Sequence, residues 1–232
     1  MSSATIEATE IKPEFRAWPK IGRLNRNVVV TEKIDGTNAA VIISYDLVPE
    51  YIKERVAHEG VFDHIRYEGG TIVINPADGQ LVWVGCQSRK RLITPEQDNF
   101  NFAQWVFDNA VSLAMDLGDG YHFGEWWGSG IQRGYGLEKG VKKFSLFNVK
   151  KWSSVMNPDA PDFFTENLHT VPVLDIHTFS TERINSVVGM LRASGSKASP
   201  GFFPPEGVVV FHTATNDLYK VMCENDETPK GA

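Results

Sequence analysis

Residues 31–38, Thr-Glu-Lys-Ile-Asp-Gly-Thr-Asn, carry the side chains whose types and spacing best suit nucleophilic chemistry. Lys33 ends a valine-rich stretch and is followed at once by Asp35, Gly36 and Asn38, so we expect a strand to end there and point the lysine into a cleft. A free lysine amine has a pKa of about 10.4 and attacks phosphorus near neutral pH only if burial or neighbouring cations favour its uncharged form. The pattern also fits a surface lysine beside an Asp-Gly turn, so both interpretations stay open.

The usual phosphate-binding loops are absent from the sequence. No GxxxxGK[ST] segment occurs, and residues 128–133 begin like a dinucleotide fingerprint but have Arg133 where the third glycine belongs. If a nucleotide binds, its binding must therefore depend on other chemistry. The stretch 130–136, which contains Arg133, fits a loop over a triphosphate and fits a plain surface turn equally well.

Five later segments place charged or aromatic residues along expected strands. They are 87–91 (Gln-Ser-Arg-Lys-Arg), 123–128 (Phe-Gly-Glu-Trp-Trp-Gly), 143–149 (Lys-Phe-Ser-Leu-Phe-Asn-Val), 206–211 (Glu-Gly-Val-Val-Val-Phe) and 218–222 (Leu-Tyr-Lys-Val-Met). With 31–38, their order resembles the covalent nucleotidyltransferase superfamily of ATP-dependent DNA ligases, RNA ligases and mRNA capping enzymes. Within it, the sequence resembles the second phage-type RNA ligase family, over residues 12–226.

The resemblance implies that Lys33 attacks the α-phosphate of ATP and carries AMP through a phosphoramidate bond. Its neighbours Glu32 and Ile34, together with Asn38, belong to the same nucleotide-binding motif. Asn38 favours RNA as the substrate, because DNA ligases and capping enzymes usually have arginine there, whereas RNA ligases of this family have KxxGxN. Lys220 would be a second catalytic lysine that contacts the α-phosphate, but the family generally has two lysines in this motif and here there is one.

The basic segment 87–91 resembles the motif whose arginine contacts the nucleotide and the phosphate of the strand to be joined. Arg89 is the preferred candidate and Arg91 is the alternative, while a plain basic surface loop also fits the pattern. Lys90, Arg91 and Arg133 are weaker candidates for contact with nucleic acid.

Four further residues receive roles or candidate roles from the resemblance. Glu125 would accept hydrogen bonds from the ribose hydroxyls of ATP, and Phe147 would pack against adenine. Phe144 is the second candidate for the adenine contact. Because an odd spacing along a strand places side chains on opposite faces, only one of the two phenylalanines can line the pocket. Glu206 would place the divalent metal, Mg²⁺ or Mn²⁺, on the α-phosphate, since magnesium is held by few carboxylates together with phosphate and water.

The elements that must position these residues read as short strands with few helices. Strands are expected at 28–33, 38–44, 80–87, 121–125, 143–149, 207–212 and 218–222, with a hairpin turn at 75–79. Thr94 and Pro95 are expected to open a helix that continues at helical spacing to Leu117, and a second helix is expected from Thr181 to just before Gly195. Segments 46–70, 156–171 and 194–205 read as surface excursions. This pattern indicates an α+β domain with mainly antiparallel sheets.

Composition narrows the class of protein. A chain of 232 residues with 42% hydrophobic residues can bury a full core. The net charge of −6 argues against general coating of nucleic acid, although basic clusters at 89–91 and 139–151 fit a local phosphate track or a solvated surface equally well. No apolar run approaches the roughly 20 residues that span a bilayer, and no secretion signal is recognisable. We expect a cytoplasmic protein, no membrane partner, and reduced, buried cysteines at positions 86 and 223.

The sequence therefore predicts one adenylyltransferase domain over residues 1–232, a nucleotidyltransferase fold with sheets flanked by helices and no OB-fold. The expected activity is ATP-dependent joining of 5′-phosphate and 3′-hydroxyl RNA ends or nicks. The sequence stops about ten residues after the last motif, so we expect either a minimal ligase or one that relies on an accessory protein or subunit to bind the substrate. A DNA ligase, a capping-type nucleotidyltransferase and a non-catalytic nucleotide-binding or nucleic-acid-binding protein of the same fold are the alternatives.

Overall fold

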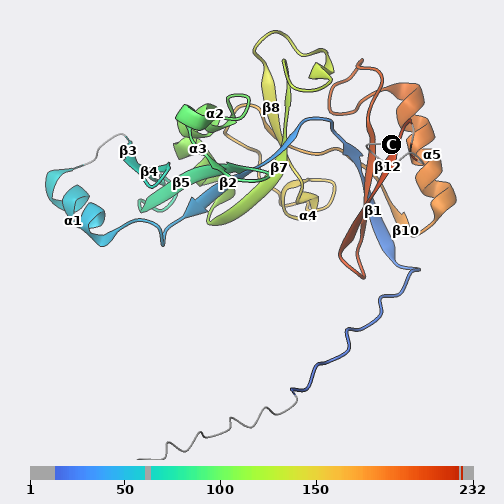
Figure 1. Cartoon of the computed structure of the whole chain (residues 1–232), viewed down its shortest axis with the longest axis horizontal. Coiled ribbons are helices and arrows are strands. Elements are labelled where there is room, and N and C mark those ends of the chain that lie inside the picture. The colour runs from blue at the N-terminus through green and yellow to red at the C-terminus, as the bar shows by residue number, and fades with distance from the viewer. Residues whose placement is uncertain (1–13, 61–63, 225, 227–232) are drawn as a thin grey trace, which may run out of the picture.

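Two β-sheets organise the chain, and the short segment 34–36 joins them (Figure 1). The computed structural model describes residues 14–60, 64–224 and 226. Within these residues every strand belongs to one of the two sheets, so the described part of the chain contains no OB-fold. The architecture is α+β, as the sequence predicts.

The smaller sheet consists of β1 (Asn27–Lys33), β10 (Val173–Thr178), β11 (Gly207–His212) and β12 (Asp217–Met222). Its strands are antiparallel and lie in the order β10–β1–β11–β12. The helix α5 (Thr181–Ser194) covers one face, where its apolar side packs on alternate valines. The buried cluster comprises Val28, Val30, Ile184, Val187, Val188, Leu191, Val208, Val210 and Cys223.

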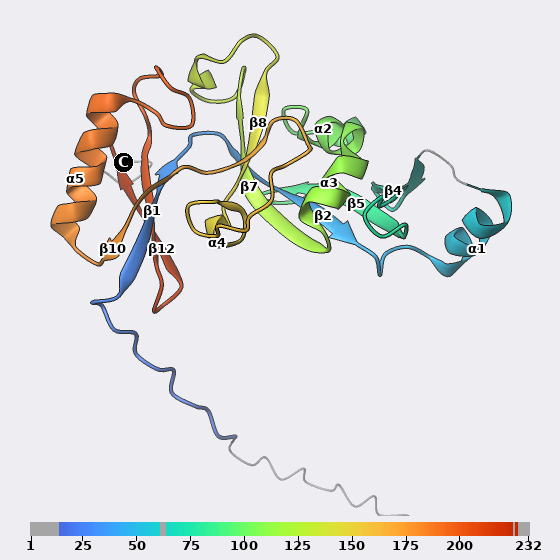
Figure 2. The ribbon, with the colours of Figure 1, turned by 180° about the vertical axis from the view of Figure 1, so that it is seen from behind.

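The larger sheet consists of β2 (Thr37–Ser44), β3 (Ile65–Tyr67), β4 (Gly70–Ile74), β5 (Leu81–Ser88), β6 (Leu92–Ile93), β7 (Gly120–Gly128), β8 (Lys142–Leu146) and β9 (Leu168–Thr170). The order is β3–β4–β5–β2–β7–β8–β9, with β6 paired to β5. All pairs are antiparallel except β8 with β9. The helices α2 (Phe102–Asp108) and α3 (Ala110–Leu117) pack on one face of the sheet, as Figure 2 shows from behind.

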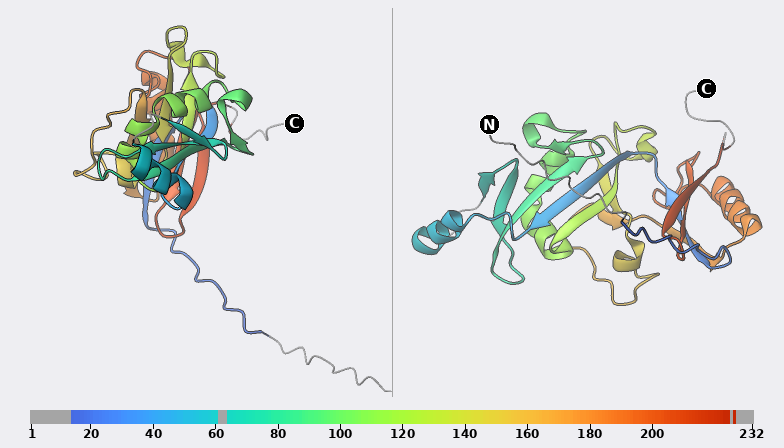
Figure 3. Two further views of the ribbon diagram at one scale, coloured as in Figure 1. Left: turned by 90° about the vertical axis from the view of Figure 1, so that its left-hand side faces the viewer. Right: turned by 60° about the horizontal axis from the view of Figure 1, so that its bottom comes forward.

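Smaller elements complete the fold. They are α1 (Glu50–Glu59), α4 (Val149–Trp152) and the 3₁₀ turns Pro95–Gln97 and Gly134–Gly136. The right-hand view of Figure 3 places α1 and α5 at opposite ends of the molecule, with the junction of the two sheets between them. None of the helices in the described part of the chain has the length and apolar character of a membrane-spanning segment. Both cysteines are buried and free, as expected.

The expected single helix up to Leu117 is wrong. The chain forms a 3₁₀ turn at Pro95–Gln97, and α2 begins only at Phe102. The carboxylate of Asp98 accepts hydrogen bonds from the backbone N–H groups of Ala103 and Gln104, at 2.8 and 3.0 Å, which fixes this later start. α2 ends at Asn109, whose backbone leaves the helical conformation (φ −112°, ψ 17°) and whose side-chain amide donates to the carbonyl of Trp105 at 2.8 Å.

Two other expectations need correction. The segment 46–70, predicted as a surface excursion, contains α1 and β3. The strand predicted at 143–149 ends at Leu146, and Val149 opens α4. The strand at 207–212, the turn at 75–79 and the helix α5 are confirmed, and α5 ends before Gly195 as predicted.

Candidate active site

Lys33 and Glu206 form an ion pair where β1 and β11 meet the larger sheet. The Nζ atom of Lys33 lies 2.6 Å from Oε2 of Glu206, and the lysine side chain is 25% exposed while the glutamate side chain is 3% exposed. The register places Lys33 opposite Gly207, so the strand pairing itself brings residue 206 beside the lysine. Two residues that the sequence assigns to the nucleophile and to the metal are thus in contact, although 173 positions separate them.

Glu125 approaches the same site from the larger sheet. Its Oε1 atom accepts a hydrogen bond from the backbone N–H of Gly36 at 3.0 Å. A side chain at position 36 would collide with β7, because a Cβ atom there would lie 2.4 Å from the carbonyl oxygen of Trp126. Glycine is therefore required after Asp35 by close packing against β7. Asn38 pairs with Glu125 across β2 and β7, so both side chains lie on the same face of the sheet.

Burial changes the acidity of Glu125. Loss of solvent raises the pKa of its carboxyl group to about 7, against the ordinary value of 4.5. The positive charge of Lys33 and the hydrogen bond from Gly36 act in the opposite direction, while the negative charges of Glu206 and Asp35 add to the increase. A carboxyl group with such a pKa is present near neutral pH both as the carboxylate, which only accepts hydrogen bonds, and as the protonated acid, which can also donate one.

Asp35 is held by residues of the β7–β8 connection. Nε of Arg133 lies 3.0 Å from Oδ2 of Asp35, and Nη1 of the same arginine donates to the carbonyl of Pro204 at 3.1 Å. The hydroxyl of Tyr135 accepts from the backbone N–H of Asp35 at 2.8 Å. Arg133 therefore connects the turn after Lys33 to the segment that precedes Glu206, which was not apparent from the sequence.

Glu32 and Ile34 point away from the ion pair. The carboxylate of Glu32 is buried and accepts from the hydroxyl of Ser196 at 2.6 Å and from the backbone N–H of Lys197 at 2.7 Å and of Ala198 at 2.9 Å. Ile34 is buried in an apolar cluster with Trp127 and other residues of the junction. In this structure the side chain of Glu32 anchors the loop after α5 and that of Ile34 contributes to the core, so neither side chain is placed for contact with a nucleotide at Lys33.

Lys220 lies on the same face of the smaller sheet as Lys33. It pairs with Val209, which pairs with Thr31, and Thr31 precedes Lys33 by two residues on β1. Leu218 and Met222, the two positions that lack the family's second lysine, share this face by the same alternation. The face therefore presents two lysines, one of them in the ion pair and the other exposed.

The two arginines of the basic turn differ in their contacts. Arg91 donates through Nη1 to the carbonyls of Leu92 and Gln97, at 3.3 and 2.9 Å, and so braces its own loop. Arg89 and Lys90 are exposed and make no hydrogen bond or ion pair with other residues in the described ranges. The turn follows Ser88, which pairs with Ala39 next to Asn38. This arrangement favours Arg89 over Arg91 as the arginine available to a ligand.

The two phenylalanine candidates lie on opposite faces. Phe144 is fully buried and packs against Phe102, with ring centroids 5.0 Å apart, in the core beneath α2. Phe147 lies just beyond β8, is 40% exposed, and donates its backbone N–H to the carbonyl of Phe123. The face that carries Glu125 and Phe123 also carries Phe147 by strand alternation. Phe147 is thus the phenylalanine that a nucleotide at this site can reach.

The residues fit a divalent ion in the manner expected for magnesium. No group of three or more His, Cys, Asp or Glu side chains that could hold a metal occurs in the part of the chain that the structure describes. The buried carboxylate of Glu206 supplies one hard oxygen ligand, and phosphate oxygens and water would supply the others. A metal at Glu206 would compete with Lys33 for that carboxylate.

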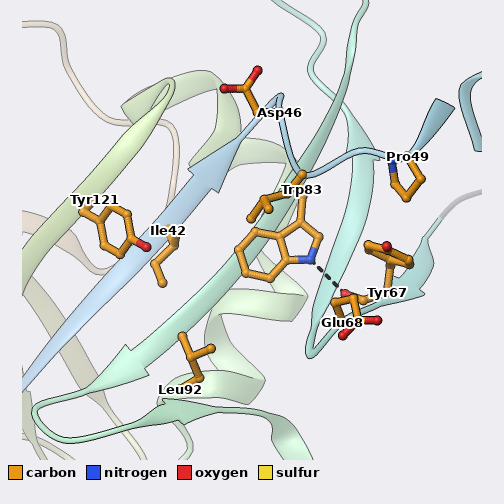
Figure 4. Close-up of a pocket in the computed structure, with 9 residues that line it drawn as sticks. Ile42, Asp46, Pro49, Tyr67, Glu68, Trp83, Leu92 and Tyr121 are labelled. Atoms are coloured by element: carbon orange, nitrogen blue, oxygen red, sulfur yellow. Dashed lines mark hydrogen bonds between the residues drawn. The ribbon is translucent and has the colours of Figure 1, made fainter. Parts of the chain in front are cut away.

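A separate groove lies farther along the same face of the larger sheet (Figure 4). It is lined by Ile42, Asp46, Leu47, Pro49, Tyr67, Glu68, Trp83, Leu92 and Tyr121, and the indole of Trp83 donates to the carbonyl of Tyr67 at 2.8 Å. None of the predicted site residues lines it. The groove is therefore distinct from the Lys33 site.

A lysine paired with a buried glutamate at the junction of two antiparallel sheets, with a second glutamate and an aromatic ring on the facing sheet, defines a nucleotidyltransferase-type site. The chain belongs to the RNA ligase family, whose sequence profile matches residues 26–222.

The solved structures to which the chain shows similarity include two forms of Naegleria gruberi RNA ligase. One is a lysine-to-alanine variant with ATP and Mn, at TM-score 0.48, and the other is an aspartate-to-alanine variant without ligand, at TM-score 0.47. Each is 16% identical in sequence, and the match covers 86% of this chain and 50% of the other. The chain thus spans half the length of these proteins. Among curated proteins, no sequence matches significantly.

Proposed function

We propose that the protein is an ATP-dependent RNA ligase that forms a covalent lysyl-AMP intermediate on Lys33. Membership in the RNA ligase family supports the class of reaction. The observation that carries the assignment of the nucleophile is the 2.6 Å contact between Lys33 and Glu206, beside Glu125. This proposal treats residues 1–232 as one adenylyltransferase domain.

In the first step, Nζ of Lys33 loses its proton and forms a bond to the α-phosphorus of ATP, while the bond between the α-phosphorus and the bridging oxygen to the β-phosphate breaks and pyrophosphate leaves. AMP then passes to a 5′-phosphate end, which frees Lys33. A 3′-hydroxyl finally attacks the activated phosphate, which releases AMP and joins the strands. Positioning and neutralisation of charge supply most of the rate increase in such reactions.

The remaining site residues take supporting roles. Glu125 and Asn38 would hold the ribose, Phe147 would stack on adenine, and Lys220 would contact the α-phosphate. Glu206 would hold Mg²⁺ or Mn²⁺, which would offset negative charge on the phosphates when bound. Arg89 would orient the 5′-phosphate end, since it is exposed and has no partner in the described part of the chain.

RNA ends or nicked duplexes are the proposed substrates, and an accessory protein or subunit is a proposed partner in holding them. ATP and a divalent metal are the proposed cofactors, as in the Naegleria gruberi RNA ligase bound to ATP and Mn. Asn38 favours RNA over DNA on the resemblance described above.

The test combines nucleotide choice with substrate choice. The protein is incubated with ATP, GTP or NAD labelled in the α-phosphate or the AMP moiety, and then with nicked RNA or nicked DNA. We expect labelling by ATP alone and sealing of RNA in preference to DNA. Labelling by GTP would indicate a capping-type enzyme, preferential sealing of DNA a DNA ligase, and no covalent adduct with any nucleotide a non-catalytic binding protein.

A further inference from the structure

The segment 14–26, which we call the arm, leaves the body of the protein before β1 (Figure 2). Its large apolar side chains are exposed. Phe15 is 91% exposed, Trp18 85% and Ile21 87%. Residues 14–21 make no hydrogen bond or ion pair with any other described residue. Exposed aromatic and aliphatic groups at this density indicate a surface that another molecule covers.

The root of the arm is fixed to the smaller sheet. The carbonyl of Leu24 accepts from Nε2 of His212 at 2.8 Å, and the carbonyl of Arg26 accepts from the backbone N–H of Phe179 at 2.9 Å. Gly22 lies so close to the β11–β12 turn that a Cβ atom there would meet Cγ2 of Thr215. The free part, residues 14–21, therefore projects from a defined point and has a maximum reach of about 26 Å.

The arm separates apolar from basic residues in a regular way. Its large apolar residues recur at every third position, as Phe15, Trp18, Ile21 and Leu24, and three basic residues recur in the same way, as Lys20, Arg23 and Arg26. Three residues per turn is the period of the polyproline II helix, so in that extended conformation one edge carries the rings and another carries the positive charge. One acidic and four basic residues give the arm a charge of +3, in a chain of net charge −6.

We propose that the arm binds single-stranded RNA outside the joining site, with bases stacked on Phe15 and Trp18 and phosphates near Lys20 and Arg23. Stacking on aromatic side chains together with a basic track is how proteins hold single strands without reading their sequence. The inference rests on the proposed function, because it takes RNA as the substrate. A protein partner is less well matched, since the basic edge would then need an acidic surface in register with it.

The position of the arm determines which RNA it can hold. β1 runs from Asn27, next to the arm, to Lys33 in the ion pair. The length of this strand separates the arm from the ion pair by about 20 Å. The arm is thus placed to contact the part of a strand that lies beyond the ends being joined. It should strengthen binding of long RNA and leave the attachment of AMP to Lys33 unchanged.

Trp18 gives a direct readout in the full chain. It is the one exposed residue among the six tryptophans, all of which lie in the described ranges. We expect acrylamide to quench its fluorescence in the free protein and a mixed-sequence RNA without a 5′-phosphate to protect it, with Trp18→Phe identifying the signal. If Trp18 is protected before RNA is added, the arm docks on the body or on another protein chain, and the proposal is overturned.

Variants then test the two edges separately. Phe15→Ala with Trp18→Ala should weaken RNA binding about tenfold or more, while Phe164→Ala, a similarly exposed phenylalanine at 76%, should not. Lys20→Gln with Arg23→Gln should reduce the slope of log affinity against log salt by about 1.4. Unchanged RNA binding in both arm variants would overturn the proposal. Labelling with ATP is measured in parallel. If the wild-type protein binds RNA through the arm but is not labelled by ATP, the ligase assignment is rejected and the proposal that the arm binds RNA stands.

Discussion

The two sheets contribute different kinds of group to one site. The smaller sheet supplies the charges that would act on phosphorus, namely Lys33, Glu206 and Lys220. The larger sheet supplies groups suited to hold a nucleoside, namely Asn38, Glu125 and Phe147. The groups proposed for reaction and for recognition therefore lie on separate sheets, and their relative placement depends on the apolar cluster and the polar contacts at the junction.

Several of the polar contacts across the junction are made by the turn after Lys33. Asp35 binds Arg133 and Tyr135 from the β7–β8 connection, and Gly36 binds Glu125 of β7. Each contact joins the end of the smaller sheet to a residue of the larger sheet or its loops. Variants of the smaller sheet should therefore lower the rate of AMP attachment, and variants of the larger sheet should raise the KM for ATP.

The largest effect is expected for Glu206→Gln. The substitution keeps the shape of the side chain but removes the charge that contacts Lys33 and would hold the metal. We expect the single-turnover rate of labelling to fall about 100-fold or more, with a much smaller change in the KM for ATP. Glu54→Gln, an exposed glutamate on α1, is the matched control. An equal loss in both variants, or a change confined to KM, would contradict the assignment.

Glu125→Gln changes a residue of the larger sheet, and we expect about a tenfold increase in the KM for ATP.

The same substitution should also remove a pH dependence of the free energy of unfolding. The pKa of Glu125 in the folded protein, about 7, lies above its ordinary value of 4.5. Between these pH values Glu125 therefore binds its proton more tightly in the folded state than in the unfolded chain. The free energy of unfolding of the wild type should thus fall relative to the variant as the pH rises from 5 to 8, by on the order of 2 kcal/mol. Parallel pH profiles of urea unfolding would contradict this.

Arg133→Gln should loosen the connection between the sheets. We expect about a fivefold lower rate of labelling, whereas the free energy of unfolding should change by less than about 1 kcal/mol, because the ion pair with Asp35 is partly exposed. Arg183→Gln provides the control, since Arg183 pairs with Asp175 at 2.8 Å away from the site. The interpretation fails if both variants lose rate equally, or if Arg133→Gln loses stability in proportion to rate.

The smallest effect is expected for Phe147→Leu, which should raise the KM for ATP about threefold with little change in stability. Phe144→Leu should do the opposite, lowering the free energy of unfolding by about 1–2 kcal/mol at an unchanged KM, because Phe144 lies in the core. Titration of ATP and urea unfolding of both variants measure the two quantities. An exchange of the two outcomes would show that Phe144 contacts the adenine.

The fold could be predicted where the sequence has a strong period. The strand Gly207–His212 and the helix α5 follow from regular apolar spacing and from Gly195. The helix α1 could not, because Ile52 is its one buried side chain and no apolar stripe marks it. The late start of α2 depends on side-chain hydrogen bonds of Asp98, and its end involves the side chain of Asn109, neither of which apolar spacing reports.

The site could be predicted in its residues but not in all its contacts. Motif order brings Lys33, Glu125 and Glu206 together, and the structure places them beside one another. Strand alternation already puts Glu32 on the face opposite to Lys33, a signal that could have identified its structural position. The contact of Arg133 with Asp35 spans 98 residues and has no counterpart in local sequence pattern.

Peptide mapping identifies the residue to which AMP attaches, which we propose is Lys33. The protein is incubated with ATP and magnesium, digested, and analysed by mass spectrometry, with Lys33→Ala and Lys220→Ala in parallel. We expect one AMP adduct, located on Lys33 in the wild type, absent from Lys33→Ala and still located on Lys33 in Lys220→Ala at a lower yield. An adduct on another residue, or one that persists at the wild-type level in Lys33→Ala, would contradict it.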